Sequence, residues 1–288
     1  MKKRIWIIIS SIVFCSCTAI VEQRRPQTGT NQVKQVQAFK LAQLTINDAG
    51  PSMCSSLKGD IFLTDLGGWR LISYKSDGVP NYESAIPSAR SFLLNGQANG
   101  IYLADDLNKN IRFYDAWGQK QNAISFSGST FVSGTALKDG TLYLLDNLAN
   151  TVVLMDNQGH ELRRFRLMTG NSGLQRPTAL AVDGTGSVIA AADAQAQKVT
   201  IFNGYGSYLG LIDARPSASP SSICFEPGTT KLWICDKENN ALLSFEIKPS
   251  GIYPKNKCNI AGPLSVTCSA FGNIFVASDQ YLWNVNEE

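Results

Sequence analysis

The sequence contains few of the side chains from which catalytic and metal sites are usually built. It has one histidine, His160, and its seven cysteines form no Cys-x-x-Cys pair and no cluster with histidine. Structural zinc sites usually draw four Cys or His ligands from closely spaced pairs, so the sequence argues against this class of site. A Gly-x-Ser-x-Gly elbow, the usual setting of a serine nucleophile in one large hydrolase fold, is also lacking. We expect His160 to lie in an exposed turn.

The apolar run at residues 5–14 is shorter than the ~20 residues that a bilayer-spanning helix needs. Lys2, Lys3 and Arg4 precede it and Cys15-Ser16-Cys17 follows, as in the export signal of a bacterial lipoprotein. We predict that Cys17 is lipidated, because cleavage before Cys15 would place bulky Phe14 at the cleavage position. The alternative, an uncleaved signal anchor, is disfavoured by the short apolar run.

The mature chain lacks an excess of positive charge. The formal net charge of +3 belongs to the full sequence and includes Lys2, Lys3 and Arg4. These three residues leave with the signal, so the net charge of the mature chain is 3 − 3, or zero. Proteins that bind nucleic acid retain a basic surplus, so we expect no nucleic-acid partner. The residues indicate no cofactor, and we expect a monomer held in the cell envelope by its lipid.

Residues 18–35 are rich in Gln, Arg and Thr and show no hydrophobic period. Such segments do not bury enough apolar surface to fold by themselves. We interpret residues 18–35 as a flexible tether between the lipid and the domain at residues 36–288.

That domain consists of repeated units, each with an apolar run that ends at an aspartate. The spacings between these aspartates are 40, 41, 47, 43 and 43 residues. In four copies, a glycine follows thirteen residues later. The aspartates are Asp65, Asp105, Asp146, Asp193, Asp236 and Asp279, and the glycines are Gly78, Gly118, Gly159 and Gly206. The fourth and sixth copies have one residue more between turn and aspartate, so their aspartates need not be equivalent to the others.

Each unit supplies four short strands and shows no helical period, which is typical of a propeller blade. Six units predict an all-β fold, a six-bladed β-propeller. After Asp279 the sequence has only one more strand, so the sixth blade lacks its outer strand. We predict that residues 36–44 complete this blade and cover its open edge.

The order of proline, strand, glycine turn, apolar-aromatic-apolar run, aspartate and glycine-ended hairpin resembles the NHL repeat, over residues 36–285. Pro177, Pro220 and Pro263 open three of these strands. The resemblance implies a propeller whose relatives include protein-binding modules, lyases and lactone hydrolases. It therefore selects an architecture and not an activity.

Two sets of repeated polar residues favour structural roles. An aspartate at the end of a strand can accept hydrogen bonds from the following turn, and repetition in every blade is what such a role predicts. We expect turn-forming roles for Asn110, Asn150 and Asn240 as well. The innermost strands offer small hydroxyl residues and no carboxylates for calcium binding or acid–base chemistry. These hydroxyl residues are Ser52, Ser88, Thr135, Thr178, Ser221 and Ser265.

Departures from the repeat point to function. The first copy replaces an Asn-rich loop by Leu66-Gly67-Gly68-Trp69-Arg70, and Trp and Arg are common interface anchors. We predict that Trp69, Arg70, Arg90, Lys109, Arg176 and Tyr281 form a binding face for an envelope protein or glycan. Tyr82, Lys198, Arg215 and Lys237 are expected around the same rim. The leading hypothesis is a non-enzymatic binding or scaffold module. The alternative is a propeller hydrolase or lyase with an atypical site.

Five cysteines follow the signal: Cys54, Cys224, Cys235, Cys258 and Cys268. Because this number is odd, at least one is free or pairs outside the chain. Cys224 and Cys235 lie on successive strands, but the loop length places Cys224 nearer Trp233. Two interpretations therefore remain open: a disulfide between Cys224 and Cys235, or free thiols buried in the core.

The lipid anchor gives the first prediction. Cys17→Ala should leave an uncleaved precursor without lipid, because the cysteine side chain is the acylation site. Mass spectrometry of the N-terminal peptide measures both features. An unmodified mature N-terminus beyond Thr18 in the unaltered protein contradicts the anchor.

Overall fold

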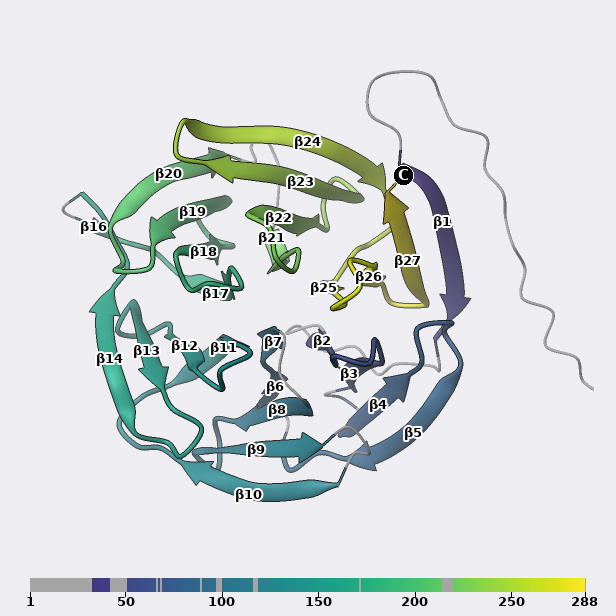
Figure 1. Cartoon of the computed structure of the whole chain (residues 1–288), viewed down its shortest axis with the longest axis horizontal. Helices are drawn as coiled ribbons and strands as arrows, with labels where there is room; N and C mark the ends of the chain where they lie inside the picture. Colours follow the sequence, from purple (N-terminus) through teal and green to yellow (C-terminus); the bar gives the residue numbers. More distant parts are fainter. Residues whose placement is uncertain are drawn as a thin grey trace, which may run out of the picture.

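A computed structural model of the chain describes residues 33–41, 51–65, 67, 69–88, 90–96, 100–115, 119–170, 172–213 and 220–287. The predicted signal, Cys17 and most of the predicted tether lie outside these residues. The described residues form six blades around an axis, each with four antiparallel strands and one of them with a short fifth strand, which confirms the six-bladed propeller (Figure 1). Within the same ranges, no helix is long and apolar enough to cross a membrane.

Each blade runs outward from the axis, and successive blades follow one another around the ring. From the innermost strand outward, the first three blades are β2 (Met53–Ser55), β3 (Ile61–Asp65), β4 (Arg70–Tyr74) and β5 (Pro80–Ala85); β6 (Ser91–Leu93), β8 (Gly100–Asp105), β9 (Asn110–Asp115) and β10 (Lys120–Ser125); and β11 (Phe131–Ala136), β12 (Leu142–Asp146), β13 (Thr151–Met155) and β14 (Glu161–Arg166).

The last three blades follow the same plan. They are β17 (Pro177–Val182), β18 (Val188–Asp193), β19 (Lys198–Asn203) and β20 (Tyr208–Asp213); β21 (Pro220–Phe225), β22 (Lys231–Asp236), β23 (Ala241–Lys248) and β24 (Gly251–Asn259); and β25 (Ser265–Cys268), β26 (Ile274–Ala277), β27 (Tyr281–Glu287) and β1 (Val33–Lys40). Short β7 (Asn95–Gly96) pairs with β11, and β15 (Met168–Thr169) and β16 (Ser172–Gly173) form a small hairpin.

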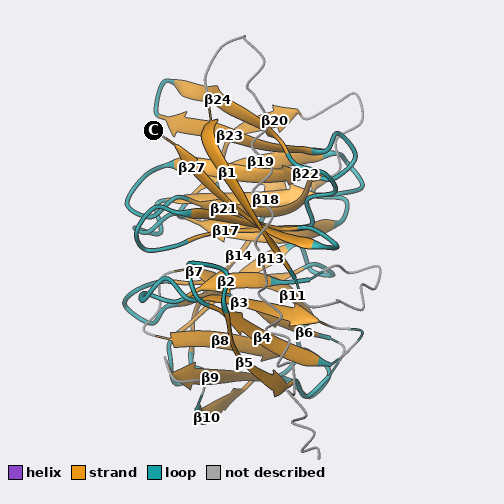
Figure 2. Cartoon of the chain, turned by 90° about the vertical axis from the view of Figure 1, so that its right-hand side faces the viewer, coloured by secondary structure: helices purple, strands orange, loops and turns teal. Residues whose placement is uncertain are grey.

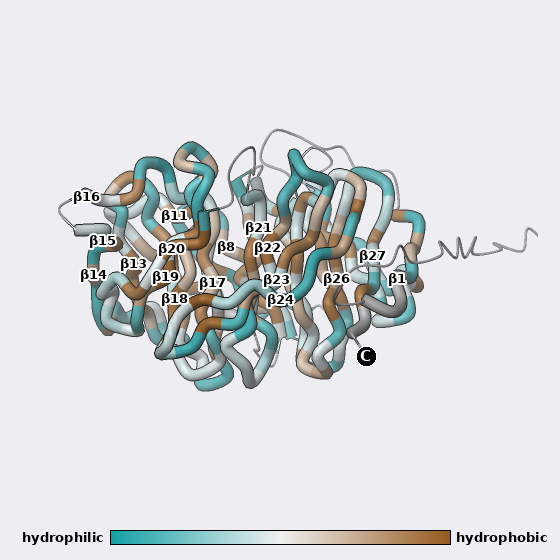
Figure 3. Tube along the Cα trace, turned by 90° about the horizontal axis from the view of Figure 1, so that it is seen from above, coloured by the Kyte–Doolittle hydropathy of each residue, from teal (hydrophilic) through white to brown (hydrophobic). Residues whose placement is uncertain are grey.

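The burial of each strand explains its pattern of apolar and polar residues. The second strand of a blade is covered on both faces by neighbouring blades, so β3 and β12 are buried at every residue and read as continuous apolar runs. The outermost strands have one covered face, and β5 and β14 alternate between exposed and partly buried residues. Figure 3 shows hydrophobic segments along the strands and hydrophilic turns at their ends.

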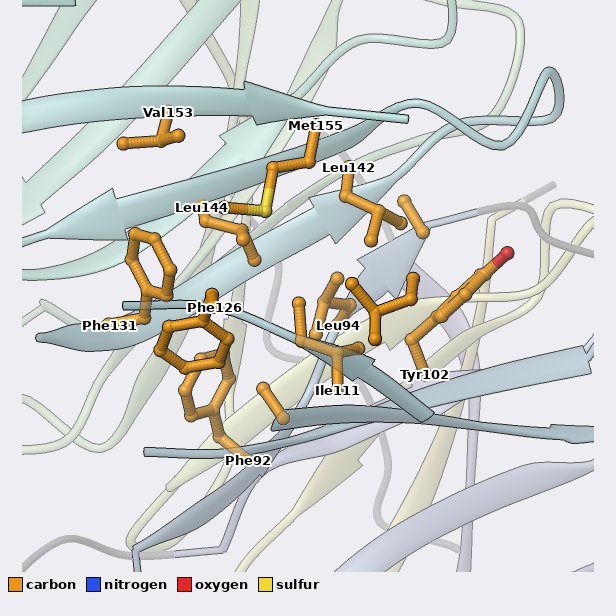
Figure 4. Packing of buried hydrophobic residues seen from close by; sticks show 13 residues of the cluster. Phe92, Leu94, Tyr102, Ile111, Phe126, Phe131, Leu142, Leu144, Val153 and Met155 are labelled. Carbon is orange, nitrogen blue, oxygen red and sulfur yellow. The ribbon is translucent and has the colours of Figure 1, made fainter. Parts of the chain in front are cut away.

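Six clusters of buried apolar side chains, counted over the described residues, fill the six interfaces between neighbouring blades. In the cluster between the second and third blades, the Phe126 and Phe131 rings lie 4.7 Å apart (Figure 4). Burial of this apolar surface is the main favourable term in folding. Because each cluster draws on two blades, no blade has a core of its own.

The N-terminal strand closes the ring, as predicted. β1 pairs antiparallel with β27, with Val36 opposite Val285 and Lys40 opposite Tyr281. The strand begins at Val33, so three residues assigned to the tether belong to it, while residues 42–44 lie outside the described part of the chain. Phe39 packs against the cluster between the sixth and first blades. β1 therefore joins the two ends of the ring (Figure 1).

The turns lie at the two ends of the strands and form two faces (Figure 2). Because the strands are antiparallel, the turns from second to third strands share one face with the connections between blades. We call this the upper face. The turns from first to second and from third to fourth strands form the lower face.

Removal of the closing strand should destabilise the whole ring. A chain that begins at Leu41 exposes the edge of β27 and loses the packing of Phe39, and we expect its free energy of unfolding to fall by several kcal/mol. Thermal unfolding followed by circular dichroism measures this loss. The matched control begins at Val33 and retains β1. Equal melting temperatures for the two truncated chains would contradict the closure.

Candidate partner-binding face

The upper face carries all six residues predicted to bind a partner. Trp69 and Lys109 lie in second-to-third-strand turns, and Arg70 and Tyr281 are the first residues of the strands that follow such turns. Arg90 and Arg176 lie in connections between blades. The repeat thus brings these residues to one face, distributed over several blades.

Of the four further residues expected around the rim of this face, two lie beside it. Lys198 and Lys237 adjoin upper-face turns, and Arg215 lies outside the described residues. Tyr82 was wrongly placed on the rim. It lies within the outer strand β5, and its ring packs edge-on against Phe62 in the core between the first and second blades. Its position inside a strand, instead of at a strand end, accounts for this error.

A buried aspartate organises each upper-face turn in the first five blades. Asp105 accepts hydrogen bonds from the Ser88 hydroxyl at 2.7 Å and from the Asn108 side-chain amide at 2.6 Å. Asp146 accepts from the Leu148 and Ala149 backbone amides. The equivalent carboxylates of Asp65, Asp193 and Asp236 are also buried and hydrogen-bonded. These contacts confirm the structural role.

The sixth blade departs from this arrangement. Ser278, not Asp279, follows the Ala277–Leu282 pair and takes the place of the aspartate. The Ser278 hydroxyl accepts from the Tyr281 amide and from the Trp283 indole at 3.2 and 3.3 Å. Asp279 is exposed. The extra residue noted in the sixth copy therefore moves its aspartate out of register, whereas Asp193 in the fourth blade stays equivalent.

The fourth residue after the aspartate adopts a left-handed backbone in each of these five turns. Its φ angle is positive at Trp69 (53°), Lys109 (49°), Asn150 (51°), Gln197 (56°) and Asn240 (49°). The turn of the first blade therefore keeps the common length and conformation, and its departure lies in the side chains. Asn110 is the first residue of β9, so Lys109 and not Asn110 holds the special position in the second blade.

Trp69 is an unusual occupant of this position. Left-handed backbone costs an L-residue about 1–2 kcal/mol, and Gly, Asn and Asp adopt it most readily. The Trp69 side chain belongs to none of the six buried clusters formed by the described residues, and the residue is 53% exposed. Packing against the core therefore does not explain why a tryptophan stands here.

The cationic residues divide into two kinds. The Arg70 guanidinium lies 2.5 Å from the buried Asp65 carboxylate and 3.3 Å from Glu83. The hydrogen bond that Arg70 donates to Asp65 raises the pKa of the Arg70 guanidinium. Lys109 is bound to Asp106 at 2.6 Å and to the Ser129 carbonyl at 2.8 Å. These two cations hold their own turns, whereas Arg90 and Arg176 are exposed.

Two apolar residues of this face were missed by the sequence analysis. Leu107 and Leu148 each stand two residues after the buried aspartate and are 60% and 79% exposed. Gly67, Gln195 and Glu238 occupy that position in the other turns. This contrast between copies was present in the sequence. With Trp69, the two leucines give the first three blades an apolar upper surface.

The channel hydroxyls join neighbouring innermost strands. The Ser52 hydroxyl accepts from the Leu93 amide at 3.0 Å, and the Ser222 hydroxyl accepts from the Val266 amide at 3.2 Å. Thr135 and Ser221 donate to carbonyls of the next blade. Ser88 instead binds Asp105. Among the described strands, the short β7–β11 ladder is the one backbone pairing between neighbouring blades. The hydroxyls supply further hydrogen bonds between the innermost strands.

Other chemistry is sparse in the described part of the chain. His160 is exposed in the lower-face turn between β13 and β14, as predicted, and its Nδ1 lies 2.8 Å from Asp156. No group of three or more His, Cys, Asp or Glu among the described residues could hold a metal ion. A cavity of about 30 Å³ at the lower ends of the innermost strands has room for about two water molecules.

Comparisons with known proteins show a shared fold and no family. No protein-family model and no curated protein matches the sequence. A chain of the mitotic checkpoint complex is similar, with a TM-score of 0.64 at 10% identity over 100% of both chains. Virginiamycin B lyase from Staphylococcus aureus gives 0.61 at 13% identity, over 88% of this chain and 100% of the lyase.

A catalytically inactive histidine-to-alanine variant of that lyase, solved with quinupristin, gives a TM-score of 0.57 at 16% identity. The match covers 85% of this chain and 82% of the variant. These similar proteins include a lyase and a component of a protein complex, so the shared propeller fold is compatible with either class of function.

Replacement of the strained tryptophan should stabilise the fold. Trp69→Asn places a residue suited to the left-handed backbone at the same position, and we expect about 1 kcal/mol of added stability, or ~2–4 °C in Tm. Gln197→Asn, at the equivalent position of the fourth blade, should change stability in the same direction. A lower Tm for Trp69→Asn alone would show instead that the indole supports the core.

Proposed function

We propose that the chain is a lipid-anchored, NHL-like propeller of the cell envelope that binds a protein or glycan without catalysing a reaction. The binding surface is the upper face of the first three blades. Trp69, Leu107 and Leu148 supply its apolar part, and Arg90 lies in the connection between the first two blades.

The strained, exposed Trp69 carries this proposal. Strained backbone persists where function requires it or where the surroundings impose it, and the turn geometry would be satisfied by asparagine, as in the third and fifth blades. The indole is also left largely exposed, away from the buried clusters. Both features are explained if a partner buries the Trp69 ring, since tryptophan is prominent among interface anchors.

The salt bridges of Arg70 and Lys109 support this surface. Arg70 neutralises the buried Asp65 carboxylate, and Lys109 links Asp106 to the connection that leads to the third blade. A side chain held in this way loses little further conformational entropy on binding. Arg70 and Lys109 therefore position the turns, while Arg90 and Arg176 remain able to pair with acidic groups of the partner.

The anchor would hold the propeller near a membrane. Cys17 and Val33 are 33 − 17 = 16 residues apart, and a flexible segment of that length extends ~20–24 Å. The propeller would then bind partners at the membrane surface or in the envelope next to it. Both the anchor and the compartment rest on the sequence of the signal.

The alternative of a propeller lyase or hydrolase has weaker support. Loss of a histidine accompanies inactivity in the similar lyase variant, but the single histidine of this chain lies in an exposed lower-face turn. In the described channel, most of the predicted hydroxyls are bound to neighbouring backbone or side chains. The Ser88 hydroxyl does donate to the Asp105 carboxylate, but both residues are fully buried and Asp105 also holds the Asn108 side chain, so this contact is better explained as structural.

A quantitative binding measurement tests the proposal. The partner is identified by co-purification with the detergent-solubilised lipoprotein, and its affinity is then measured for the unaltered chain, Trp69→Asn and Gln197→Asn. We expect Trp69→Asn to bind about thirtyfold more weakly, equivalent to about 2 kcal/mol. Gln197→Asn shares the backbone geometry on the opposite side of the ring (Figure 1) and should bind normally. Equal affinities for both variants would overturn the proposed surface.

A further inference from the structure

Four of the five cysteines described in the propeller share one interface. Cys224, Cys235, Cys258 and Cys268 are buried in the cluster between the fifth and sixth blades, whereas Cys54 lies between the first and second. The register places Trp233 opposite Cys224 and Ser222 opposite Cys235. A disulfide between Cys224 and Cys235 is therefore not formed. As expected from the sequence, the length of the loop between the two strands places Cys224 opposite Trp233.

A different pair is brought together. The sulfur atoms of Cys224 and Cys268 lie 3.1 Å apart, closer than ordinary contact between two sulfurs. A disulfide bond needs ~2.05 Å, so the two sulfurs need to approach by about 1 Å. Both side chains are buried on the innermost strands of adjacent blades, β21 and β25.

The strand register explains why these two thiols meet. Ser222 and Ser265 are equivalent, because Ser222 pairs with the residue before Asp236 and Ser265 pairs with the residue before Ser278, which takes the place of the aspartate. Cys224 stands two residues after Ser222, and Cys268 stands three after Ser265. Since side chains alternate along a strand, the two cysteines point from opposite faces of their blades. They therefore face each other across one interface.

The neighbouring backbone holds the two strands in this arrangement. The Val266 amide donates to the Ser222 hydroxyl at 3.2 Å, and the Ser221 hydroxyl donates to the Pro263 carbonyl at 3.3 Å. From the other side, the Ser55 hydroxyl of the first blade donates to the Cys268 carbonyl at 2.8 Å. The pair lies where the last blade meets both of its neighbours.

We propose that Cys224 and Cys268 form a disulfide that joins the fifth and sixth blades when the chain folds in the presence of a disulfide oxidant. One cysteine thiolate attacks the oxidant, forming a mixed disulfide and releasing one thiol. The second cysteine thiolate then attacks the mixed disulfide and releases the other thiol. Two S–H bonds are lost, one S–S bond forms, and the two electrons and two protons leave on the reduced oxidant.

The other two cysteines of the interface are poor competitors. Cys235 pairs with Leu242, and Leu242 pairs with Cys258, so an intervening strand separates them. Strands lie ~4.7–4.9 Å apart, which puts the Cys235 and Cys258 backbones well beyond the reach of a disulfide. A bond between Cys235 and Cys258 therefore does not compete with the proposed one.

The timing of this bond follows from burial. Burial, together with the hydrogen bond to Cys224, raises the pKa of Cys268 well above its usual value. The reactive thiolate is therefore scarce once the blades have closed, and both cysteine residues are almost fully buried. The bond should form while the fifth and sixth blades assemble, and the reduced folded protein should oxidise slowly.

Peptide mapping tests the bond without any substitution. The reduced full-length chain is refolded with a mixture of oxidised and reduced glutathione, alkylated in denaturant and digested. We expect the Cys224 and Cys268 peptides to be linked to each other, with Cys54, Cys235 and Cys258 alkylated. Alkylation of both Cys224 and Cys268 after refolding, or linkage of either to another cysteine of the propeller, would overturn the proposal.

Matched variants give a second readout. Reduction should lower the Tm of the refolded unaltered chain by ~5–15 °C, because the bond closes a loop of 44 residues. The same reduction should leave the Tm of Cys224→Ala unchanged, while Cys235→Ala should respond as the unaltered chain does. Equal responses of these two variants would contradict the assignment. Partner binding is not involved, so this test is independent of the proposed function.

Discussion

The upper face depends on the hydrogen bonds that a buried carboxylate accepts at the end of the second strand of a blade. In four blades it accepts hydrogen bonds from the turn that follows, and in the first blade Asp65 accepts them from Arg70 at the start of the third strand. A buried charge is tolerated only when it is paired and hydrogen-bonded. The turn must therefore present donors to the carboxylate, and this requirement sets its length and the left-handed residue four positions later.

The same requirement links the fold to the proposed function. Because the turns are alike in backbone, they act as equivalent supports on which different side chains can be displayed. In the third and fifth blades the special position holds asparagine, but in the first it holds Trp69, with Arg70 bound to the carboxylate beside it. A binding residue can thus be exchanged at one turn without any change to the ring.

The architecture could be predicted from the sequence because it is repeated. The spacing of the aspartates gave the number of blades, and the missing last strand predicted the closing strand β1. The start of that strand was missed because Val33, Lys34 and Gln35 carry no clear strand pattern. The Arg70–Asp65 pair and the facing thiols of Cys224 and Cys268 depend on which faces of the strands meet in space. Sequence spacing does not contain that information.

Unfolding of Asp105→Asn at different pH values tests the role of the buried carboxylate most directly. Burial alone would raise the pKa of Asp105, but hydrogen bonds from Asn108 and Ser88 outweigh it and the pKa is lowered. Its stabilising contribution is therefore present above the unfolded pKa of ~3.9 and is lost as pH falls through the lower folded pKa.

In urea titrations, Asp105→Asn should lose about 1.5–3 kcal/mol at neutral pH. This loss should shrink at a pH below the folded pKa of Asp105. Asp279→Asn, one residue beyond the serine that replaces the carboxylate in the sixth blade, should behave as the unaltered chain. Equal stability of Asp105→Asn and Asp279→Asn at neutral pH would contradict the account.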